Sequence, residues 1–314
     1  MNTTRGERPL SGQRIGLFGK GGSGKSTVTV MLARALRDQG YPVVVLDADS
    51  TNVGLAAALG ADREPDPLLE HFGGMVFSGG SVTCPVDDPT PLTAADLSVE
   101  ALPSRFVGHC GRNIHLLTAG KLGELGPGAG CDGPVAKIAR DLRLRVQGSR
   151  PLTLVDFKAG FEDAARGVIT SVDRLVAVVD PTTAAVAIAG HMLGMVRAIR
   201  GGTPPATEHL ERPDLVETQR RLFRDTRVRD VQCVLNRVPT PQVEARLREV
   251  LSGMGIPVLG VLGDDPDVAE QWLLGVPLHS PRLEDAGARI AARLEASGGV
   301  RPRRRDPASA APTA

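Results

Sequence analysis

The segment from residue 19 to residue 27 has the residue types and the spacing of a phosphate-binding loop. It reads Gly-Lys-Gly-Gly-Ser-Gly-Lys-Ser-Thr and fits the pattern G-x-x-x-x-G-K-[ST]. Glycines let successive backbone N–H groups curl around a phosphate, and a helix that begins near Lys25 adds its positive dipole end. Lys25 supplies a point charge for the β- and γ-phosphates, and the Ser26 hydroxyl is placed to ligate Mg²⁺. We therefore predict a nucleotide site lined by Gly21, Gly22, Ser23, Gly24, Lys25, Ser26 and Thr27.

Carboxylates follow two further apolar runs. Asp47 and Asp49 end the run that begins at Val44, and Asp156 ends the run that begins at Leu152. An acid at an edge near the phosphate loop can orient and deprotonate an attacking water. Asp156 has the position of an acid that holds Mg²⁺, usually through water. Carboxylates that only cap loops are the alternative interpretation in both places.

Short apolar runs alternate with helical patterns along the chain, and these elements must position the side chains above. The runs are rich in Val, Ile and Leu and nearly continuous, which is typical of strands covered on both faces. We predict strands over 14–19, 42–47, 152–157, 175–180, 231–236 and 258–262, and helices over 25–39, 183–200, 241–253 and 283–296. Such alternation predicts an α/β fold of three layers, with a mostly parallel central sheet flanked by helices.

The remaining segments suggest one domain with additions. We predict an N-terminal extension over 1–12, a single P-loop domain over 13–297 and a disordered, Arg-rich tail over 298–314. Residues 61–113 are dense in Pro, Gly, Asp and Thr, so we interpret them as an irregular insertion, with a hairpin near Ser81–Cys84. Residues 203–230 form a second polar insertion with one amphipathic helix.

The composition excludes several classes of protein. The chain has 314 residues, of which 41% are hydrophobic and 23% charged, so global disorder and a fibrous fold are excluded. A formal net charge of +1 and 3% aromatic residues give no reason to expect a nucleic-acid partner. No apolar window is long enough for a membrane span, and the first residues lack the apolar stretch of a secretory signal. We therefore expect a cytoplasmic protein with no membrane partner.

A second lysine at the start of the loop, Lys20, adds information because the chain has only five lysines. The order K-G-G-x-G-K-S-T resembles the deviant Walker A loop of the dimerising SIMIBI-class ATPases, which include MinD, ParA and the nitrogenase iron protein. The resemblance implies an ATPase that binds ATP and Mg²⁺ and forms a homodimer on ATP binding. It implies that Lys20 reaches the partner's phosphates and that Asp49 activates water. It also implies that Gly160 contacts the γ-phosphate, that Asn236 reads adenine and that Asp265 belongs to a loop over the base.

Two stretches, 116–134 and 156–167, narrow the resemblance to the CooC-type accessory ATPases of carbon monoxide dehydrogenase. In those proteins a Cys-x-Cys pair from each chain binds Ni²⁺ or Zn²⁺ at the dimer interface. Here Cys131 matches the first cysteine, but Gly133 stands in the second position. The segment 127–133 also resembles the cluster loop of the nitrogenase iron protein, and Asp163 stands where that family has its other cysteine. A complete four-thiolate site is therefore not visible in either pattern.

Four functions compete at this point. The leading hypothesis is an ATPase that dimerises on ATP and delivers a metal to a metalloenzyme client. The alternatives are a positioning or partition ATPase like MinD or ParA, an iron–sulfur reductase like the nitrogenase iron protein, and a nucleotide-dependent regulator that does not hydrolyse ATP. Cys131 as a thiol that only packs at an interface is the alternative interpretation of the metal site.

Overall fold

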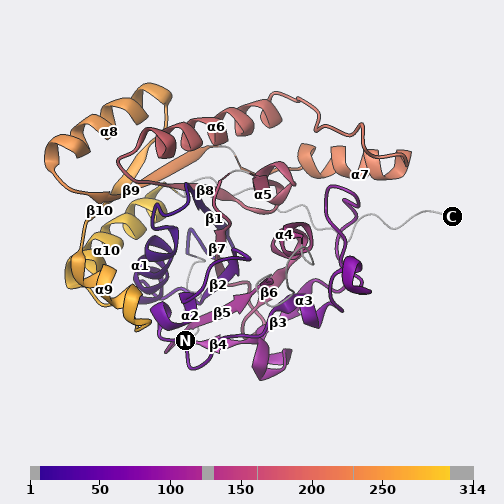
Figure 1. The fold of residues 1–314 in the computed structure, drawn as a ribbon, viewed down its shortest axis with the longest axis horizontal. Helices are drawn as coiled ribbons and strands as arrows, with labels where there is room; N and C mark the ends of the chain where they lie inside the picture. The colour runs from indigo at the N-terminus through magenta and orange to yellow at the C-terminus, as the bar shows by residue number, and fades with distance from the viewer. Residues whose placement is uncertain (1–7, 122–130, 161, 229, 298–314) are drawn as a thin grey trace, which may run out of the picture.

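The computed structural model describes residues 8–121, 131–160, 162–228 and 230–297. Among these residues, eight strands form one sheet in the order β10-β9-β8-β1-β7-β2-β5-β4. All neighbours in the sheet are parallel except β4, which runs antiparallel to β5. The predicted α/β fold with a mostly parallel central sheet is confirmed (Figure 1). The predicted tail over 298–314 lies outside the described residues.

The apolar runs become strands with nearly the predicted bounds. The strands of the sheet are β1 (Arg14–Gly19), β2 (Val43–Ala48), β4 (Gly108–His109), β5 (Ile114–Thr118), β7 (Leu152–Phe157), β8 (Arg174–Val179), β9 (Val231–Val238) and β10 (Val258–Gly263). β3 (Asp96–Ser98) and β6 (Arg143–Arg145) pair separately. The sequence prediction missed β5, which places His115 among its apolar residues.

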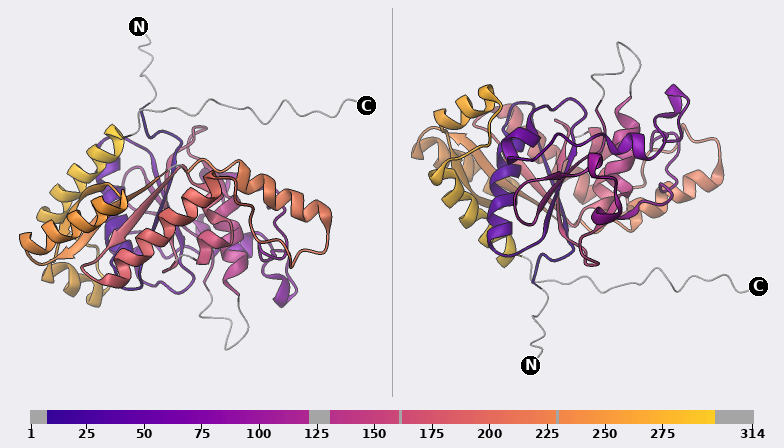
Figure 2. Two further views of the ribbon diagram at one scale, coloured as in Figure 1. Left: turned by 90° about the horizontal axis from the view of Figure 1, so that it is seen from above. Right: turned by 90° about the horizontal axis from the view of Figure 1, so that it is seen from below.

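The helices cover both faces of the sheet. They are α1 (Lys25–Asp38), α2 (Leu55–Leu59), α3 (Leu68–His71), α4 (Asp132–Asp141), α5 (Glu162–Ala165), α6 (Thr183–Arg200), α7 (Pro213–Arg224), α8 (Pro241–Met254), α9 (Pro266–Leu274) and α10 (Pro281–Ala296). Among these residues, no helix combines the length and the apolarity that crossing a membrane requires. The amphipathic helix predicted within 203–230 is α7, and Figure 2 shows it extending beyond α6, on the side away from α8 and α10.

Two apolar cores lie on opposite faces of the sheet. One core joins the strands to buried residues of α1 and α10, and the other joins them to α4, α6 and α8. Successive residues of a strand point to opposite faces, so the near-continuous apolar sequence of the central strands follows from this double cover. β1, for example, gives Ile15 and Leu17 to one core and Phe18 to the other. This is the three-layer arrangement predicted from the sequence.

The insertion over 61–113 is more closely packed than its composition suggests. It contains α3, β3, β4 and short 3₁₀ turns at Val76–Ser78, Val99–Ala101 and Ser104–Phe106. The predicted hairpin near Ser81–Cys84 is wrong, because Val82 instead forms an isolated parallel bridge with Met75. Both side chains are buried in the core on the α4 face, and this burial fixes the backbone path.

The carboxyl ends of the parallel strands meet at one edge of the sheet. β1 lies between β7 and β8, and β2 lies on the other side of β7. The loop that follows β1 is therefore flanked by the ends of β7 and β8. Ligands of open parallel sheets bind at this edge, so the chain order itself brings the predicted site residues together.

Candidate nucleotide site

The phosphate-binding loop connects β1 to α1, as the sequence predicts. Gly22 and Gly24 have positive φ angles of 76° and 85°, a backbone region that favours glycine. A Cβ atom on Gly24 would lie 2.1 Å from the amide nitrogen of Asn236, so a side chain is excluded there on space as well. Gly24 is also the N-cap of α1, and it has no side chain to occupy the first amides of the helix. These amides are directed toward the loop, where an anion is stabilised.

Ser26 and Asp156 meet beside this loop. The Ser26 hydroxyl donates to Asp156 Oδ2 at 2.8 Å, and the Asn52 side-chain amide donates to the same hydroxyl at 3.0 Å. Asp156 Oδ1 is buried and has no hydrogen-bond partner among the described residues. Burial raises the pKa of Asp156 to about 6, although the nearby Lys25 ammonium opposes this shift. An orphaned carboxylate oxygen next to a hydroxyl is a donor set that suits Mg²⁺.

Asp47 is paired with a lysine that the sequence analysis did not identify as a site residue. Asp47 lies opposite Asp156 in the β2–β7 register. Lys121 donates to Asp47 Oδ2 at 2.6 Å and to the carbonyl oxygens of Asp49 and Asn52 at 2.9 and 2.6 Å. Burial raises the pKa of Asp47 to about 7, against the lowering effect of Lys121. Lys121 thus holds the loop after β2 in place, and its only sequence signal is the scarcity of lysine.

Asp49 lies at the start of the loop that follows β2 and is 8% exposed. Its Oδ1 accepts hydrogen bonds from the Thr51 backbone amide at 3.1 Å and from the Thr51 hydroxyl at 2.8 Å. The carboxylate is therefore fixed at the same sheet edge as Asp156. Activation of water by Asp49 stays a prediction.

Lys20 and Gly160 have partners within the chain. The Lys20 ammonium forms an ion pair with Asp180 Oδ2 at 3.0 Å, just past the end of β8. The Gly160 amide, predicted to contact a γ-phosphate, donates to the Gly19 carbonyl at 2.9 Å. Contact of either residue with a phosphate would require these bonds to be exchanged, and both roles stay predictions.

Residues of β9 and α9 form hydrogen bonds with the phosphate-binding loop and the start of α1. The Asn236 amide donates to the Ser23 carbonyl at 2.7 Å, and Arg237 donates to the Gly22 carbonyl at 2.9 Å. The indole of Trp272 donates to the Thr27 hydroxyl at 2.9 Å. Sequence reasoning missed Arg237 and Trp272, whose contacts span more than two hundred residues.

Asp265, the second residue predicted near the base, is the N-cap of α9. Its Oδ1 accepts from the Asp267 amide at 3.1 Å, and its Oδ2 accepts from the Ser280 hydroxyl at 2.7 Å. The hydrogen bond from Ser280 lowers the pKa of this carboxyl. Asp265 thereby joins the start of α9 to the start of α10, and its place over a bound base stays a prediction.

The bond from Asn236 to Ser23 yields a test that separates support of the loop from recognition of the base. We expect Asn236→Ala to lower the free energy of unfolding by about 1–3 kcal/mol, because a buried acceptor loses its donor. We also expect affinity for ATP and GTP to fall by similar factors, because the loop that binds phosphate is common to both. Urea unfolding and nucleotide titrations measure these effects. Loss confined to adenine nucleotides would contradict the supporting role.

Comparison with known proteins shows the family and the fold to which this chain is related. Residues 17–278 match the family model of the CobQ/CobB/MinD/ParA nucleotide binding domain. The chain belongs to this family. The fold agrees: the MinD septum site-determining protein of Pyrococcus horikoshii, solved with Mg-ADP, superposes with a TM-score of 0.57 at 18% identity, covering 91% of this chain and 97% of that one.

Curated relatives of this MinD/ParA-type chain include two that are more than 30% identical over more than half of its length. The carbon monoxide dehydrogenase accessory protein CooC of Rhodospirillum rubrum is 34% identical over 186 residues, which are 59% of this chain and 69% of that protein. An ATP-binding protein of Methanocaldococcus jannaschii, uncharacterized by its name, is 32% identical over 174 residues, 54% of this chain and 67% of that protein. The closeness to CooC that the sequence suggested is confirmed.

Cys131, the cysteine of the CooC resemblance, begins α4 of this MinD/ParA-type chain. Its Sγ is the N-cap acceptor and receives the Gly133 amide at 3.3 Å. A Cβ atom on Gly133 would lie 2.4 Å from Cys84 Sγ. Cys84 therefore occupies the space that a second cysteine at position 133 would need, so the insertion over 61–113 brings another thiol to this place. Residues 122–130 of the resembling stretch lie outside the described residues.

The described residues of one chain do not provide a complete metal site. No cluster of three or more His, Cys, Asp or Glu side chains that could hold a metal occurs among them. Cys110, a cysteine of the insertion over 61–113, lies in the core on the α1 face, where burial raises the pKa of its thiol to about 12. Asp163 forms an ion pair with Arg166 at 3.2 Å. Cys84 and Cys131 both lie beside Gly133, so the fold brings two thiols together at this place.

Asp132 connects Cys131 to the nucleotide loops. The Ser50 hydroxyl, directly after Asp49, donates to Asp132 Oδ1. The Lys158 ammonium, two residues after Asp156, donates to Asp132 Oδ2. These two bonds lower the pKa of the Asp132 carboxyl, although partial burial opposes them. One carboxylate thus contacts both loops of the nucleotide site and is bonded through the backbone to the cysteine.

Proposed function

We propose that this chain is an ATPase that dimerises on ATP and uses hydrolysis to deliver a soft metal ion, Ni²⁺ or Zn²⁺, to a metalloenzyme client. The observation that carries the proposal is Asp132, which joins the two nucleotide loops to Cys131. The similarity to CooC, named an accessory protein of carbon monoxide dehydrogenase, supports the metalloenzyme client. A binding or partition role alone would leave this connection to a thiol without a use.

Each part of the nucleotide site has a role in this proposal. The loop amides and Lys25 bind the phosphates of ATP. Ser26 and Asp156 would hold Mg²⁺, which neutralises charge on the phosphates. Asp49 orients a water molecule for attack. Lys20 leaves Asp180 and contacts the phosphates bound to the partner, so that two chains share two nucleotides.

The metal is cargo, and thiolates are the groups that would bind it. Cys131 and Cys84 supply two sulfurs per chain, so two chains supply four, a set that suits Ni²⁺ or Zn²⁺. Burial raises the pKa of the Cys84 thiol, so the thiol holds its proton more tightly, and a bound metal has to displace that proton. The metal would then rest between the two chains, where nucleotide turnover can separate its ligands.

Anaerobic titration with Zn²⁺ and Ni²⁺, with ATP bound, tests the cargo site. We expect about one ion for each pair of chains, with loss of tight binding in Cys131→Ser and in Cys84→Ala, because two sulfurs remain from four. Cys233→Ala is the matched control, because Cys233 is buried in β9 and belongs to the core on the α4 face. Equal stoichiometry in the wild type and Cys131→Ser would refute the metal role and leave the ATPase proposal standing.

A further inference from the structure

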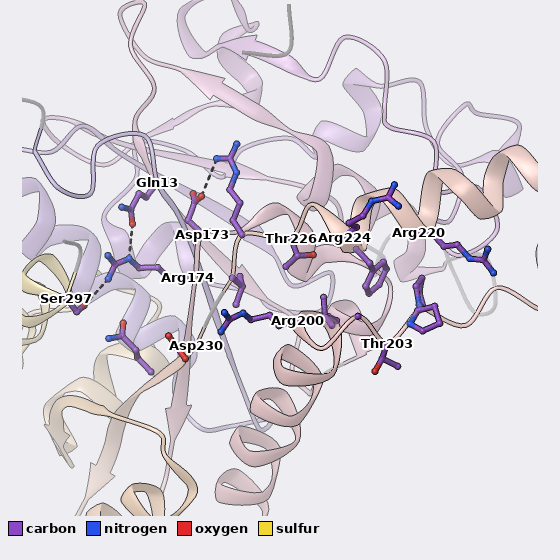
Figure 3. Close-up of a pocket in the computed structure, with 18 residues that line it drawn as sticks. Gln13, Asp173, Arg174, Arg200, Thr203, Arg220, Arg224, Thr226, Asp230 and Ser297 are labelled. Atoms are coloured by element: carbon purple, nitrogen blue, oxygen red, sulfur yellow. Dashed lines mark hydrogen bonds and ion pairs between the residues drawn. The ribbon is translucent and has the colours of Figure 1, made fainter. Parts of the chain in front are cut away.

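A large cavity of about 1030 Å³ lies at the edge of the sheet opposite the nucleotide site (Figure 3). Gln13 just before β1, Arg174 at the start of β8 and Gln232 near the start of β9 line it at the amino ends of the strands. The last turn of α6, the loop 202–205 and α7 complete its wall. The cavity therefore belongs to a different part of the molecule from the phosphate-binding loop.

The lining of this cavity has more arginines than carboxylates. Its lining residues include five arginines and two aspartates, Arg174, Arg200, Arg220, Arg224, Arg227, Asp173 and Asp230. Arg227 pairs with Asp173, and Arg224 pairs with Glu217 outside the lining, so these two arginines each have an acidic partner. Arginines still outnumber carboxylates at the cavity, and such a region attracts anionic groups.

Arg174 is a lining arginine with three hydrogen bonds to uncharged groups. Arg174 donates to Gln13 Oε1 at 2.8 Å, to the Leu294 carbonyl at 3.0 Å and to the Ser297 hydroxyl at 2.9 Å. Asp173, its neighbour, accepts from the Arg14 backbone amide at 2.8 Å and pairs with Arg227 at 3.4 Å. The guanidinium of Arg174 is thus oriented by groups that do not neutralise it.

The arrangement of the arginines indicates an extended ligand. Figure 3 shows Arg174 at one end, Arg200 in the middle, and Arg224 and Arg220 toward the other end. A single phosphate group would need donors that converge on one point, whereas these side chains follow the length of the cavity. Apolar contacts come from Ile199, Phe223, Val228 and two prolines, so stacking surface for a planar ligand is limited to one aromatic ring. Arginines spaced along a cavity can each pair with one carboxylate of an extended polypeptide that has acidic side chains at similar spacing.

We propose that this cavity binds an acidic, extended segment of a partner protein. The occupant must supply carboxylates, and the sequence after Ser297 has the opposite charge, with Arg301, Arg303, Arg304 and Arg305 against Asp306. A partner at this edge can stay bound while nucleotide enters and leaves at the opposite edge. The inference does not depend on metal delivery or on dimerisation.

Fluorescence anisotropy with a labelled, short poly-glutamate peptide tests this site. Saturating Mg-ADP keeps the phosphate-binding loop occupied, and poly-glutamine of equal length serves as the uncharged probe. We expect poly-glutamate to bind with an affinity that falls as salt rises, and poly-glutamine not to bind. Arg220→Glu combined with Arg224→Glu should weaken poly-glutamate binding about tenfold. ATP turnover should not change, because both side chains are exposed on α7, at the edge of the sheet opposite the nucleotide site.

Arg246→Glu on α8 is the matched control. Arg246 pairs with Glu249 on an exposed helix surface, as Arg224 pairs with Glu217. We expect this variant to bind poly-glutamate as the wild type does. Equal weakening by Arg246→Glu, or unchanged binding in the double variant, would overturn the site. Displacement of the peptide by inorganic triphosphate at lower concentration than by unlabelled poly-glutamate would show a phosphate site and overturn the peptide proposal.

Discussion

Lys20→Ala is expected to lower ATP turnover by about 100-fold or more while single chains still bind nucleotide. The reason is electrostatic: in the proposed dimer Lys20 would stabilise charge that develops on the partner's phosphates during hydrolysis, whereas Lys25 would bind the phosphates of its own chain. We also expect ATP to lose its ability to produce dimers. Steady-state hydrolysis, nucleotide affinity and gel filtration with ATP measure the three effects.

Asp180→Asn separates this role from a structural one. In the single chain Lys20 pairs with Asp180, so Lys20→Ala could act simply by breaking an ion pair. Asparagine at 180 keeps the size of the side chain and removes the charge that retains Lys20. If Lys20 acts across a dimer, Asp180→Asn should keep turnover and dimer formation. Equal loss in both variants would mean that the ion pair, and not the partner's nucleotide, is what Lys20 serves.

The fold followed from the sequence wherever apolar runs were continuous. β1 and β7 have the predicted bounds, because a strand buried on both faces must be apolar at each position. β5 escaped prediction because His115 interrupts its run and because it follows an irregular insertion. The hairpin predicted at Ser81–Cys84 is wrong for a different reason: Val82 is buried in a core to which distant elements contribute, and this burial decides the local backbone path.

The candidate site was predictable where its residues are close in sequence. The phosphate-binding loop needs its residue types at fixed spacing, so residues 19–27 carry their own signal. Lys121 was not predictable, because its partner Asp47 lies 74 residues away. Cys84 is a similar case, because only the packing of the insertion against Gly133 brings its sulfur near Cys131. Spacing along the chain holds no information about such contacts.

Asp132→Asn is expected to abolish the effect of nucleotide on Cys131. In the wild type, exchange of ATP for ADP should change the rate of Cys131 alkylation by a factor within about 5–150-fold, the usual range for coupling between two sites. Asparagine keeps the shape of the side chain, but it removes the charge that holds Lys158 and one of the oxygens available to Ser50 and Lys158. Movement of either nucleotide loop would then no longer displace the start of α4. Alkylation followed by mass spectrometry, on protein loaded with each nucleotide, measures the rate.

Asp88→Asn shows whether the effect is specific to the nucleotide loops. Asp88 belongs to the insertion over 61–113, and its carboxylate accepts a hydrogen bond at 3.3 Å from Lys137 of α4, the helix that Asp132 begins. This bond ties α4 to the insertion. If Asp132→Asn acts only by loosening α4, Asp88→Asn should reduce the effect of nucleotide on Cys131 alkylation to the same extent. If Asp132 instead couples the nucleotide loops to Cys131, only Asp132→Asn should abolish the effect of nucleotide. Lys158→Met, which removes the other half of the ion pair, should then have the same result. Retention of the nucleotide effect in Asp132→Asn would refute the link and, with it, the observation that favours metal delivery over the other functions of this ATPase family.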